Sequence, residues 1–305
     1  MYLVFDTETT GLPLNYKAPL TDFKNWPRMV QLAWQIHDVK GDLIEVKNYI
    51  VKPDGFTIPY NSEKIHGIST ELANNKGIPL DEVLSLFTDA LKNASYIIGH
   101  NISFDNNIVG CEFLRSNMTN ILTDKISVDT KEEATEFCQL PGGRGGKYKW
   151  PNLSELYVKL FNESFAEAHN ASADVEATTR CFLELLRKEV ISFEKVGMND
   201  ADFQNFINNN PSTIQLIGLN VQPYEEESID ESQKTEELSI DDIDDSNQDE
   251  DLNSCFSHLH VHSQYSILQA TGDIELLVDK AVEFNMPALG LTDHANMFGA
   301  YKFIN

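Results

Sequence analysis

The sequence has few cysteines and no long apolar run. Its four cysteines stand far apart and form no CxxC pair, which is typical of reduced thiols in a cytoplasmic protein. No segment approaches the roughly 20 consecutive apolar residues that span a bilayer. The amino terminus reaches an acid at position 6 without the basic and apolar regions of a signal peptide. These absences predict a soluble, cytoplasmic protein with no membrane partner.

Positive charge is also scarce. The 305 residues carry a formal net charge of −25, and residues 224–253 contribute −13 of it. In residues 1–190, 19 Lys or Arg stand against 26 Asp or Glu, so the composition indicates no general surface for a polyanion. We therefore expect any contact with nucleic acid to be local or to depend on metal ions.

Apolar patterning predicts an α/β fold in the first part of the chain. Strand patterns occur at residues 2–5, 30–37, 44–51, 96–99 and 126–128. Helices are expected to begin near Pro79, Phe104, Leu153 and Ala171. Strands that come first and then alternate with helices imply a mixed sheet flanked by helices.

The rest of the chain divides into three parts. Residues 188–223 are a weakly patterned extension, with one or two helical turns expected at 202–207. Residues 224–253 are too polar to pack and predict a disordered acidic linker. In residues 254–305 a strand at 255–261, a helix at 274–284 and a strand at 288–292 predict the start of a βαβ domain. One face of that helix is expected to hold Ile274, Leu277, Val278, Ala281 and Val282.

Acidic residues recur at the ends of predicted elements. In LVFDTETTGL, residues 3–12, Asp6 and Glu8 are one residue apart, so on a strand they point the same way. Asp105 follows the strand at 96–99 in HNISFD, and Asp174 lies in the first turn of a helix, five residues after His169. Each acid alone also fits an ordinary surface or helix-terminal charge, but the set is far more specific.

Together these residues resemble the motifs of the DEDDh class of 3′-to-5′ exonucleases, the family of the epsilon proofreading subunit of bacterial DNA polymerase III. The resemblance covers about residues 1–187 and includes TTGL at 9–12 and IHGI at 65–68. It implies a ribonuclease-H-like exonuclease domain over residues 1–187. Two segments, 15–27 and 139–150, are longer than a minimal member needs.

The resemblance also implies roles for individual residues. Asp6, Glu8 and Asp174 would hold one divalent ion, Asp6 and Asp105 would serve a second, and His169 would be the general base. Carboxylates without cysteine favour Mg²⁺ or Mn²⁺. The positions that match substrate contacts of the family are Thr9, Leu12, His66, Asn101 and Phe104.

The stretch GGRGGKYKW, residues 142–150, mixes glycine with basic and aromatic residues. This composition suits contact with a nucleic-acid strand. A mobile, solvated loop has the same composition, so both interpretations stay open.

Histidines alternate along the first strand expected in residues 254–305. His258, His260 and His262 would share one face, and His294 follows the next strand, in a geometry that suits metal ligands. HLHVHSQYS and LTDHANMFGA resemble the amino-terminal edge of the PHP domain in the alpha subunit of bacterial DNA polymerase III. The resemblance implies an incomplete metal site of His260, His262 and His294. It departs from the family at Gln269, near which an acid is usual.

These resemblances imply a 3′-to-5′ exodeoxyribonuclease of the DNA polymerase III proofreading type. It would release mononucleotides from DNA 3′ ends with two Mg²⁺ or Mn²⁺ ions. A replicative polymerase in the same polypeptide and a sliding clamp would be its partners. Two alternatives remain, an RNA-trimming exoribonuclease and a non-catalytic nucleic-acid-binding or clamp-tethering module.

Overall fold

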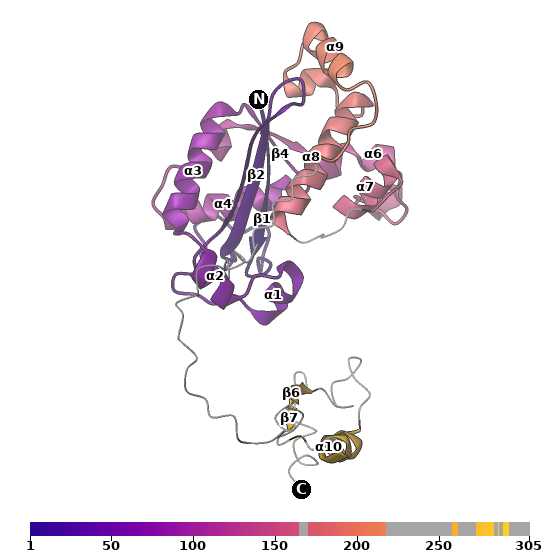
Figure 1. Cartoon of the computed structure of the whole chain (residues 1–305). Coiled ribbons are helices and arrows are strands. Elements are labelled where there is room, and N and C mark those ends of the chain that lie inside the picture. The colour runs from indigo at the N-terminus through magenta and orange to yellow at the C-terminus, as the bar shows by residue number, and fades with distance from the viewer. Residues whose placement is uncertain (165–169, 218–257, 262–272, 284–285, 287–288, 293–305) are drawn as a thin grey trace, which may run out of the picture. The chain divides into compact units, whose positions relative to one another are not determined.

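The structure is a computed structural model that describes residues 1–164, 170–217, 258–261, 273–283, 286 and 289–292 (Figure 1). The chain divides into two units, Met1–Asp230 and Glu231–Asn305. Within the described ranges, no helix combines the length and the apolar character that crossing a membrane requires. Cys111, Cys138 and Cys181 are buried free thiols.

A five-stranded mixed sheet lies at the centre of the first unit. Its order is β3-β2-β1-β4-β5, with β1 (Tyr2–Thr9), β2 (Met29–His37), β3 (Leu43–Ile50), β4 (Tyr96–Gly99) and β5 (Ile126–Asp129). β1 pairs antiparallel with β2 along its length, but its parallel pairing with β4 covers only residues 2–4. The carboxyl half of β1 therefore runs past the end of β4.

Helices cover both faces of this sheet. They are α1 (Tyr60–His66), α2 (Thr70–Lys76), α3 (Leu80–Asn93), α4 (Ile102–Arg115), α5 (Thr130–Glu133), α6 (Thr135–Cys138), α7 (Leu153–Phe161), α8 (Ala171–Arg187) and α9 (Asp200–Asn209). Short 3₁₀ turns occur at Leu122–Asp124, Arg144–Gly146 and Phe193–Val196. Figure 1 shows α3 and α4 on one side of the sheet and α8 on the other.

The alternating side chains of β1 belong to two separate cores. Leu3 and Phe5 pack in the core that contains the apolar residues of α3 and α4. Tyr2 and Val4 pack in the core that contains those of α7 and α8. Because successive strand residues face opposite sides, Asp6 and Glu8 continue the α8 face of β1, while Thr7 continues the α4 face.

The predicted fold class is confirmed, and several predicted boundaries need correction. β1 does not end at residue 5 but continues to Thr9, so the two acids lie within the strand. The helix expected near Phe104 begins at Ile102, and Pro79 precedes α3 as its N-cap residue. The short helices α1 and α2 had no predicted counterpart. Their lengths of 7 residues each give too few turns for a helical period to be recognised.

The described part of the extension after α8 packs on the rest of the first unit. Its weak apolar pattern did not predict this packing. α9 spans ten residues instead of one or two turns, and a capping box at its start joins Asn199 and Asp202. Its Phe206 is fully buried in the core shared with α8, and Phe203 stacks on Phe193 at 4.6 Å between ring centroids. Ile214 extends this packing beyond the helix.

The described elements of the second unit follow the predicted βαβ order. β6 (His258–Val261) and β7 (Leu289–Leu291) are parallel, and α10 (Ile274–Glu283) lies between them in sequence. The helix that carries the predicted apolar face is present as α10, and that face is only partly covered. Ile274 and Ala281 are buried, but Val278 is 37% exposed and Val282 is 70% exposed. The expected linker 224–253 lies outside the described residues.

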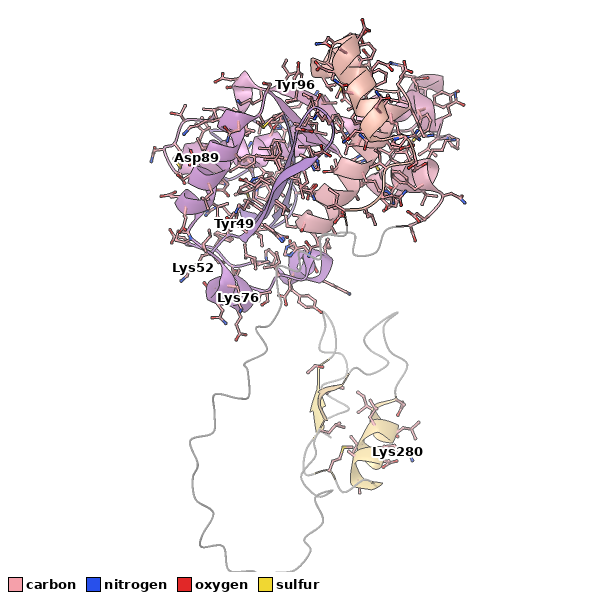
Figure 2. All side chains as sticks on the ribbon, turned by 45° about the horizontal axis from the view of Figure 1, so that its top comes forward. Tyr49, Lys52, Lys76, Asp89, Tyr96 and Lys280 are labelled. Atoms are coloured by element: carbon pink, nitrogen blue, oxygen red, sulfur yellow. The ribbon has the colours of Figure 1, made fainter. Side chains whose placement is uncertain are left out.

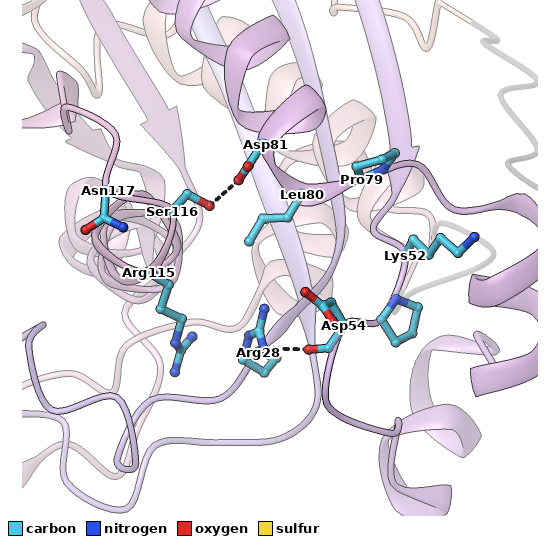
Figure 3. Close-up of a pocket in the computed structure, with 10 residues that line it drawn as sticks. Arg28, Lys52, Asp54, Pro79, Leu80, Asp81, Arg115, Ser116 and Asn117 are labelled. Atoms are coloured by element: carbon cyan, nitrogen blue, oxygen red, sulfur yellow. Dashed lines mark hydrogen bonds between the residues drawn. The ribbon is translucent and has the colours of Figure 1, made fainter.

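A buried ion-pair network holds the segment between β1 and β2. The fully buried Glu112 of α4 accepts hydrogen bonds at Oε1 from Arg28 Nε (3.0 Å), Arg115 Nη1 (3.0 Å) and the Met29 amide (2.9 Å). Arg115 also donates to three backbone carbonyls, those of Phe23, Trp26 and Pro27. Arg28 and Arg115 both line a cavity of about 710 Å³, and Figure 3 labels them among its lining residues.

Replacing Glu112 should destabilise the protein strongly. Glu112→Ala leaves two guanidinium groups without their shared carboxylate, and we expect the free energy of unfolding to fall by about 3 to 5 kcal/mol. Urea unfolding followed by circular dichroism measures this change. Asp89→Ala is the matched control, because Asp89 on the surface of α3 makes the same i,i+3 type of ion pair with Lys92 but is 69% exposed (Figure 2). Its expected cost is below about 1 kcal/mol, and equal losses would contradict the role of burial.

Candidate active site

Three carboxylates gather on the face of β1 that meets α8. Asp6 and Glu8 come from β1, and Asp174 comes from the first turn of α8. That turn is fixed by Asn170, whose side chain accepts a hydrogen bond from the Ser172 amide at 3.0 Å. One carboxylate oxygen from each acid lies within 4.8 Å of the others. Glu8 and Asp174, which are 166 positions apart in the sequence, thus meet because α8 packs on β1.

A fourth acid, Asp105, approaches this cluster from the other side of β1. It lies in the first turn of α4 and is 3% exposed. Its Oδ1 accepts hydrogen bonds from the backbone amide of Thr7 at 3.1 Å and from the Thr7 hydroxyl at 2.7 Å. Thr7 stands between Asp6 and Glu8 and points to the α4 face. Because strand residues alternate, the same stretch of β1 meets Asp105 of α4 on one face and Asp174 of α8 on the other.

Burial and mutual repulsion raise the pKa values of these acids. Burial raises the pKa of Asp6 well above its usual range, and the charges of Asp105, Asp174 and Glu8 raise it further. Burial and the charges of Asp174 and Asp105 raise the pKa of Glu8 to about 9. Burial raises the pKa of Asp105 to about 7, although the hydrogen bonds from Thr7 oppose this increase. A cation in the cluster would oppose these shifts, because it favours the charged form of the carboxylates.

The donor set fits a hard divalent cation. Its oxygens converge, and among the described residues no ion pair neutralises Asp6, Glu8 or Asp105. Oxygen ligands without sulfur or nitrogen suit Mg²⁺ or Mn²⁺. The described site therefore has the chemistry of a divalent-metal centre.

Two of the residues predicted to contact substrate lie beside the end of β1. Thr9 is buried, and its hydroxyl donates to the Gly11 carbonyl at 2.6 Å. His66, the last residue of α1, is 5% exposed, and its Nδ1 accepts from the Ile68 amide at 3.1 Å. Burial lowers the pKa of His66, and the nearby backbone of Thr9 opposes this shift. The ring of His66 thus lies next to Thr9.

Asn101 and Phe104 lie at the start of α4, and Leu12 lies in the loop after β1. Asn101 is the N-cap residue, in a left-handed conformation with φ of 75°. Phe104 is half-buried, with its ring centroid 6.5 Å from that of Tyr16. Leu12 is 72% exposed. The loop after β1 and the first turn of α4 therefore present both polar and apolar side chains.

Several predicted site residues are not described. His169, His262 and His294 lie outside the described residues, and for His260 only the backbone in β6 is described. The role of His169 as general base and the histidine site of the second unit therefore stay predictions.

Sequence reasoning missed two neighbours of the predicted contacts. Lys131 of α5 donates a hydrogen bond to the side-chain carbonyl of Asn101, and Tyr16 packs near Phe104. The two residues of each pair are far apart in the sequence, and neither Lys131 nor Tyr16 belongs to a recognisable motif. Only the fold brings them together.

The sheet, its flanking helices and the acidic cluster fit a metal-dependent nuclease, and the chain belongs to the exonuclease family. The sequence model of that family, described as "Exonuclease", matches residues 3–182, which is more than half of the chain. A second family, the PHP domain, matches residues 258–305. A match to the exonuclease family is thus followed in the same chain by a match to the PHP domain.

Curated relatives match a short stretch of the chain. The DNA polymerase III alpha subunit of Chlamydia trachomatis is 64% identical over 45 residues, which are 15% of this chain and 4% of that protein. The alpha subunit of Aquifex aeolicus is 50% identical over 48 residues, which are 16% of this chain and 4% of that protein. The chain thus spans only about 4% of the length of these relatives.

Solved structures match the first unit. Escherichia coli exonuclease I in complex with a dA16 oligonucleotide aligns with a TM-score of 0.50 and 21% identity, over 67% of this chain and 44% of that one. Exonuclease I from Methylocaldum szegediense aligns with a TM-score of 0.50 and 20% identity, over 63% and 41% of the two chains. At these identities the likeness shows the fold.

Stability without metal should fall as the pH rises. The folded chain keeps protons on Asp6, Glu8 and Asp105 above the pH at which the unfolded chain loses them. The folded state therefore binds more protons from about pH 4 to about pH 9, and the free energy of unfolding decreases with pH in this window. Urea unfolding in excess chelator at about pH 5 and about pH 8 measures the decrease.

Glu8→Gln is the matched variant for this measurement. The carboxamide has no proton to lose, so the variant should lose less stability with pH and exceed the wild type at about pH 8. Mg²⁺ should stabilise the wild type more at about pH 8 than at about pH 5, because metal binding requires deprotonated ligands. Parallel pH profiles for wild type and variant would show that Glu8 does not carry the shift.

Proposed function

We propose that this chain hydrolyses phosphodiester bonds at DNA 3′ ends, releases mononucleotides, and proofreads for a replicative polymerase in the same polypeptide. The observation that carries the proposal is the convergence of Asp6, Glu8 and Asp174 on one face of β1, with Asp105 beside them. Membership of the exonuclease family supports the reaction class. The PHP match and the similarity to DNA polymerase III alpha subunits support the polymerase partner.

The four acids would hold two divalent ions, with Asp6, Glu8 and Asp174 at the first and Asp6 and Asp105 at the second. When bound, such ions supply the positive charge that phosphodiester hydrolysis requires and acidify the attacking water. The protein's own residues position the carboxylates that would bind these ions. Thr7 orients the Asp105 carboxylate through two hydrogen bonds, and the Asn170 cap fixes the turn that carries Asp174.

The remaining site residues would bind and orient the strand. Thr9 and Asn101 would hydrogen-bond the terminal nucleotide, and His66 would contact its phosphate or sugar. Leu12 and Phe104 would stack on or separate its bases, which suits the large exposure of Leu12. We assign the exonuclease domain to residues 1–187, the extension to 188–223, the linker to 224–253 and the PHP part to 254–305.

Nuclease assays with an acid variant test the reaction. The full chain with Mg²⁺ or Mn²⁺ should release mononucleotides from a 5′-labelled single-stranded DNA, one at a time from the 3′ end. Asp174→Asn should abolish this release, because it removes a charged ligand from the cluster while keeping its shape. A gel time course of the shortening strand measures the effect.

The matched control for this assay is Asp200→Asn, which also alters an acid in the first turn of a helix but at an exposed position in α9. It should degrade the strand like the wild type. Full activity of Asp174→Asn, or of the wild type in excess chelator, would contradict the metal-dependent mechanism. A labelled RNA strand of the same sequence distinguishes the RNA-trimming alternative.

His169 is the proposed general base. An unperturbed imidazole has a pKa of about 6.5 and can take a proton from the attacking water near neutral pH. His169→Ala should therefore lower kcat by about 10² to 10⁴ fold and leave the affinity for Mg²⁺ nearly unchanged. Single-turnover kinetics and metal titration measure the two quantities. Loss of metal binding together with activity would instead make His169 a ligand.

A further inference from the structure

The loop before α7 holds an exposed tryptophan beside the predicted site. Trp150 is 59% exposed, although its indole ring is among the largest apolar surfaces in the chain. The ammonium nitrogen of Lys131 lies 4.5 Å from the centre of this ring. Lys131 also donates to the side chain of Asn101. A cation, an aromatic face and the start of α4 therefore meet at one place.

The position of Trp150 is fixed by contacts on both sides of it. The Lys149 amide donates to the Leu140 carbonyl at 2.8 Å and closes the loop. On the other side, Nε2 of His100 donates to the Pro151 carbonyl at 3.1 Å. Burial lowers the pKa of His100 to about 4, so this ring is neutral near neutral pH. The ring of Trp150 is thus presented to solvent by ordered backbone.

The same contacts connect this pair to the acidic cluster. Asp129, the last residue of β5, accepts hydrogen bonds from the amides of Asn101 (2.9 Å) and Lys131 (3.0 Å). Asn101 caps α4, and Asp105 lies four residues further along, which is about one helical turn. The Asp129 carboxylate therefore holds the start of α4 beside the start of α5. As a result, Lys131 and Trp150 lie next to the first turn of α4, which carries Asp105.

In the part of the chain that the structure describes, no ion pair joins the Lys131 ammonium to a carboxylate. Glu155 of α7 is paired with Lys149 at 2.6 Å, and Glu133 of α5 is paired with Lys195. The charge of Lys131 therefore meets only the amide oxygen of Asn101 and the π-face of Trp150 in the contacts described above. A phosphate oxygen would be a stronger partner than either.

We propose that Lys131 and Trp150 form a nucleotide-binding subsite of the exonuclease, with the ammonium on a strand phosphate and the indole stacked on a base. The proposal rests on the proposed function, because it assigns the substrate strand as the occupant. A single nucleotide offers both an anion and an aromatic face, which matches this pair. The subsite extends the predicted contacts of Asn101 away from the acids and holds the strand during hydrolysis.

Binding of a short oligothymidylate to the full chain tests the subsite. The assay uses excess chelator, so that the strand is not degraded, and follows the anisotropy of the labelled oligonucleotide. Trp150→Ala should weaken binding by about 5- to 150-fold, the range expected for losing one stacked base. Trp150→Phe keeps a ring and should restore most of the affinity.

Lys131 is tested through the salt dependence of binding. Each phosphate contact to a single strand contributes about 0.7 to the slope of log K against log salt. Lys131→Met should lower that slope by about 0.7, and Lys131→Arg should restore it. Lys92→Met is the control, because Lys92 is an exposed lysine of α3, and its slope should match that of the wild type.

Tryptophan fluorescence gives an independent readout. Trp26 and Trp34 are buried, with exposures of 3% and 1%, so a stacked base should quench Trp150 selectively. The proposal is overturned if the oligonucleotide does not quench the wild type, or if Trp150→Ala and Lys131→Met bind as the wild type does. Release of mononucleotides by the wild type and Trp150→Ala with Mg²⁺ is measured separately. Quenching without any release would refute the proposed function and leave the subsite standing.

Discussion

Repulsion among carboxylates at the end of β1 is the constraint on which the site depends. Two unit charges 4 Å apart repel by about 4 kcal/mol at an effective dielectric constant of 20, and Asp6 faces three other acids. The cluster therefore needs protons or cations, and it also needs a backbone that does not yield. Packing on both faces of β1 supplies that backbone. The two cores thus stabilise β1 at the place where repulsion between its acids destabilises the folded chain.

Much of this arrangement could be predicted from the sequence. Alternation on a strand placed Asp6 and Glu8 on one face, and strand–helix order placed Asp105 and Asp174 at helix starts, all as the structure has them. The strand at 96–99 has the predicted bounds. These predictions succeeded because strand period and helix capping are local properties that depend on neighbouring residues.

The contacts that sequence could not predict are those made across loops. Lys131 reaches Asn101 from 30 positions away, and Trp150 reaches Lys131 only because His100 and Leu140 hold the ends of its loop. The apolar periodicity of the sequence does not predict such a contact. The partly exposed face of α10 is another case: an apolar pattern predicts which residues seek burial, but the neighbours of a helix decide which are covered.

The segment between β1 and β2 starts and ends at one point. The Thr10 amide donates to the Arg28 carbonyl, and the Arg28 amide donates to the Thr10 hydroxyl, both at 2.9 Å, while Glu112 holds Arg28 from α4. Closing a longer loop costs only about 0.6 kcal/mol for each doubling of its length. Exposed residues between these anchors, such as Lys17 and Thr21, can therefore be exchanged with little effect on the acids of β1, whereas the buried Trp26 is held by the core. Variation at these exposed positions alone can give the acidic strand different surroundings while the buried part of the loop stays the same.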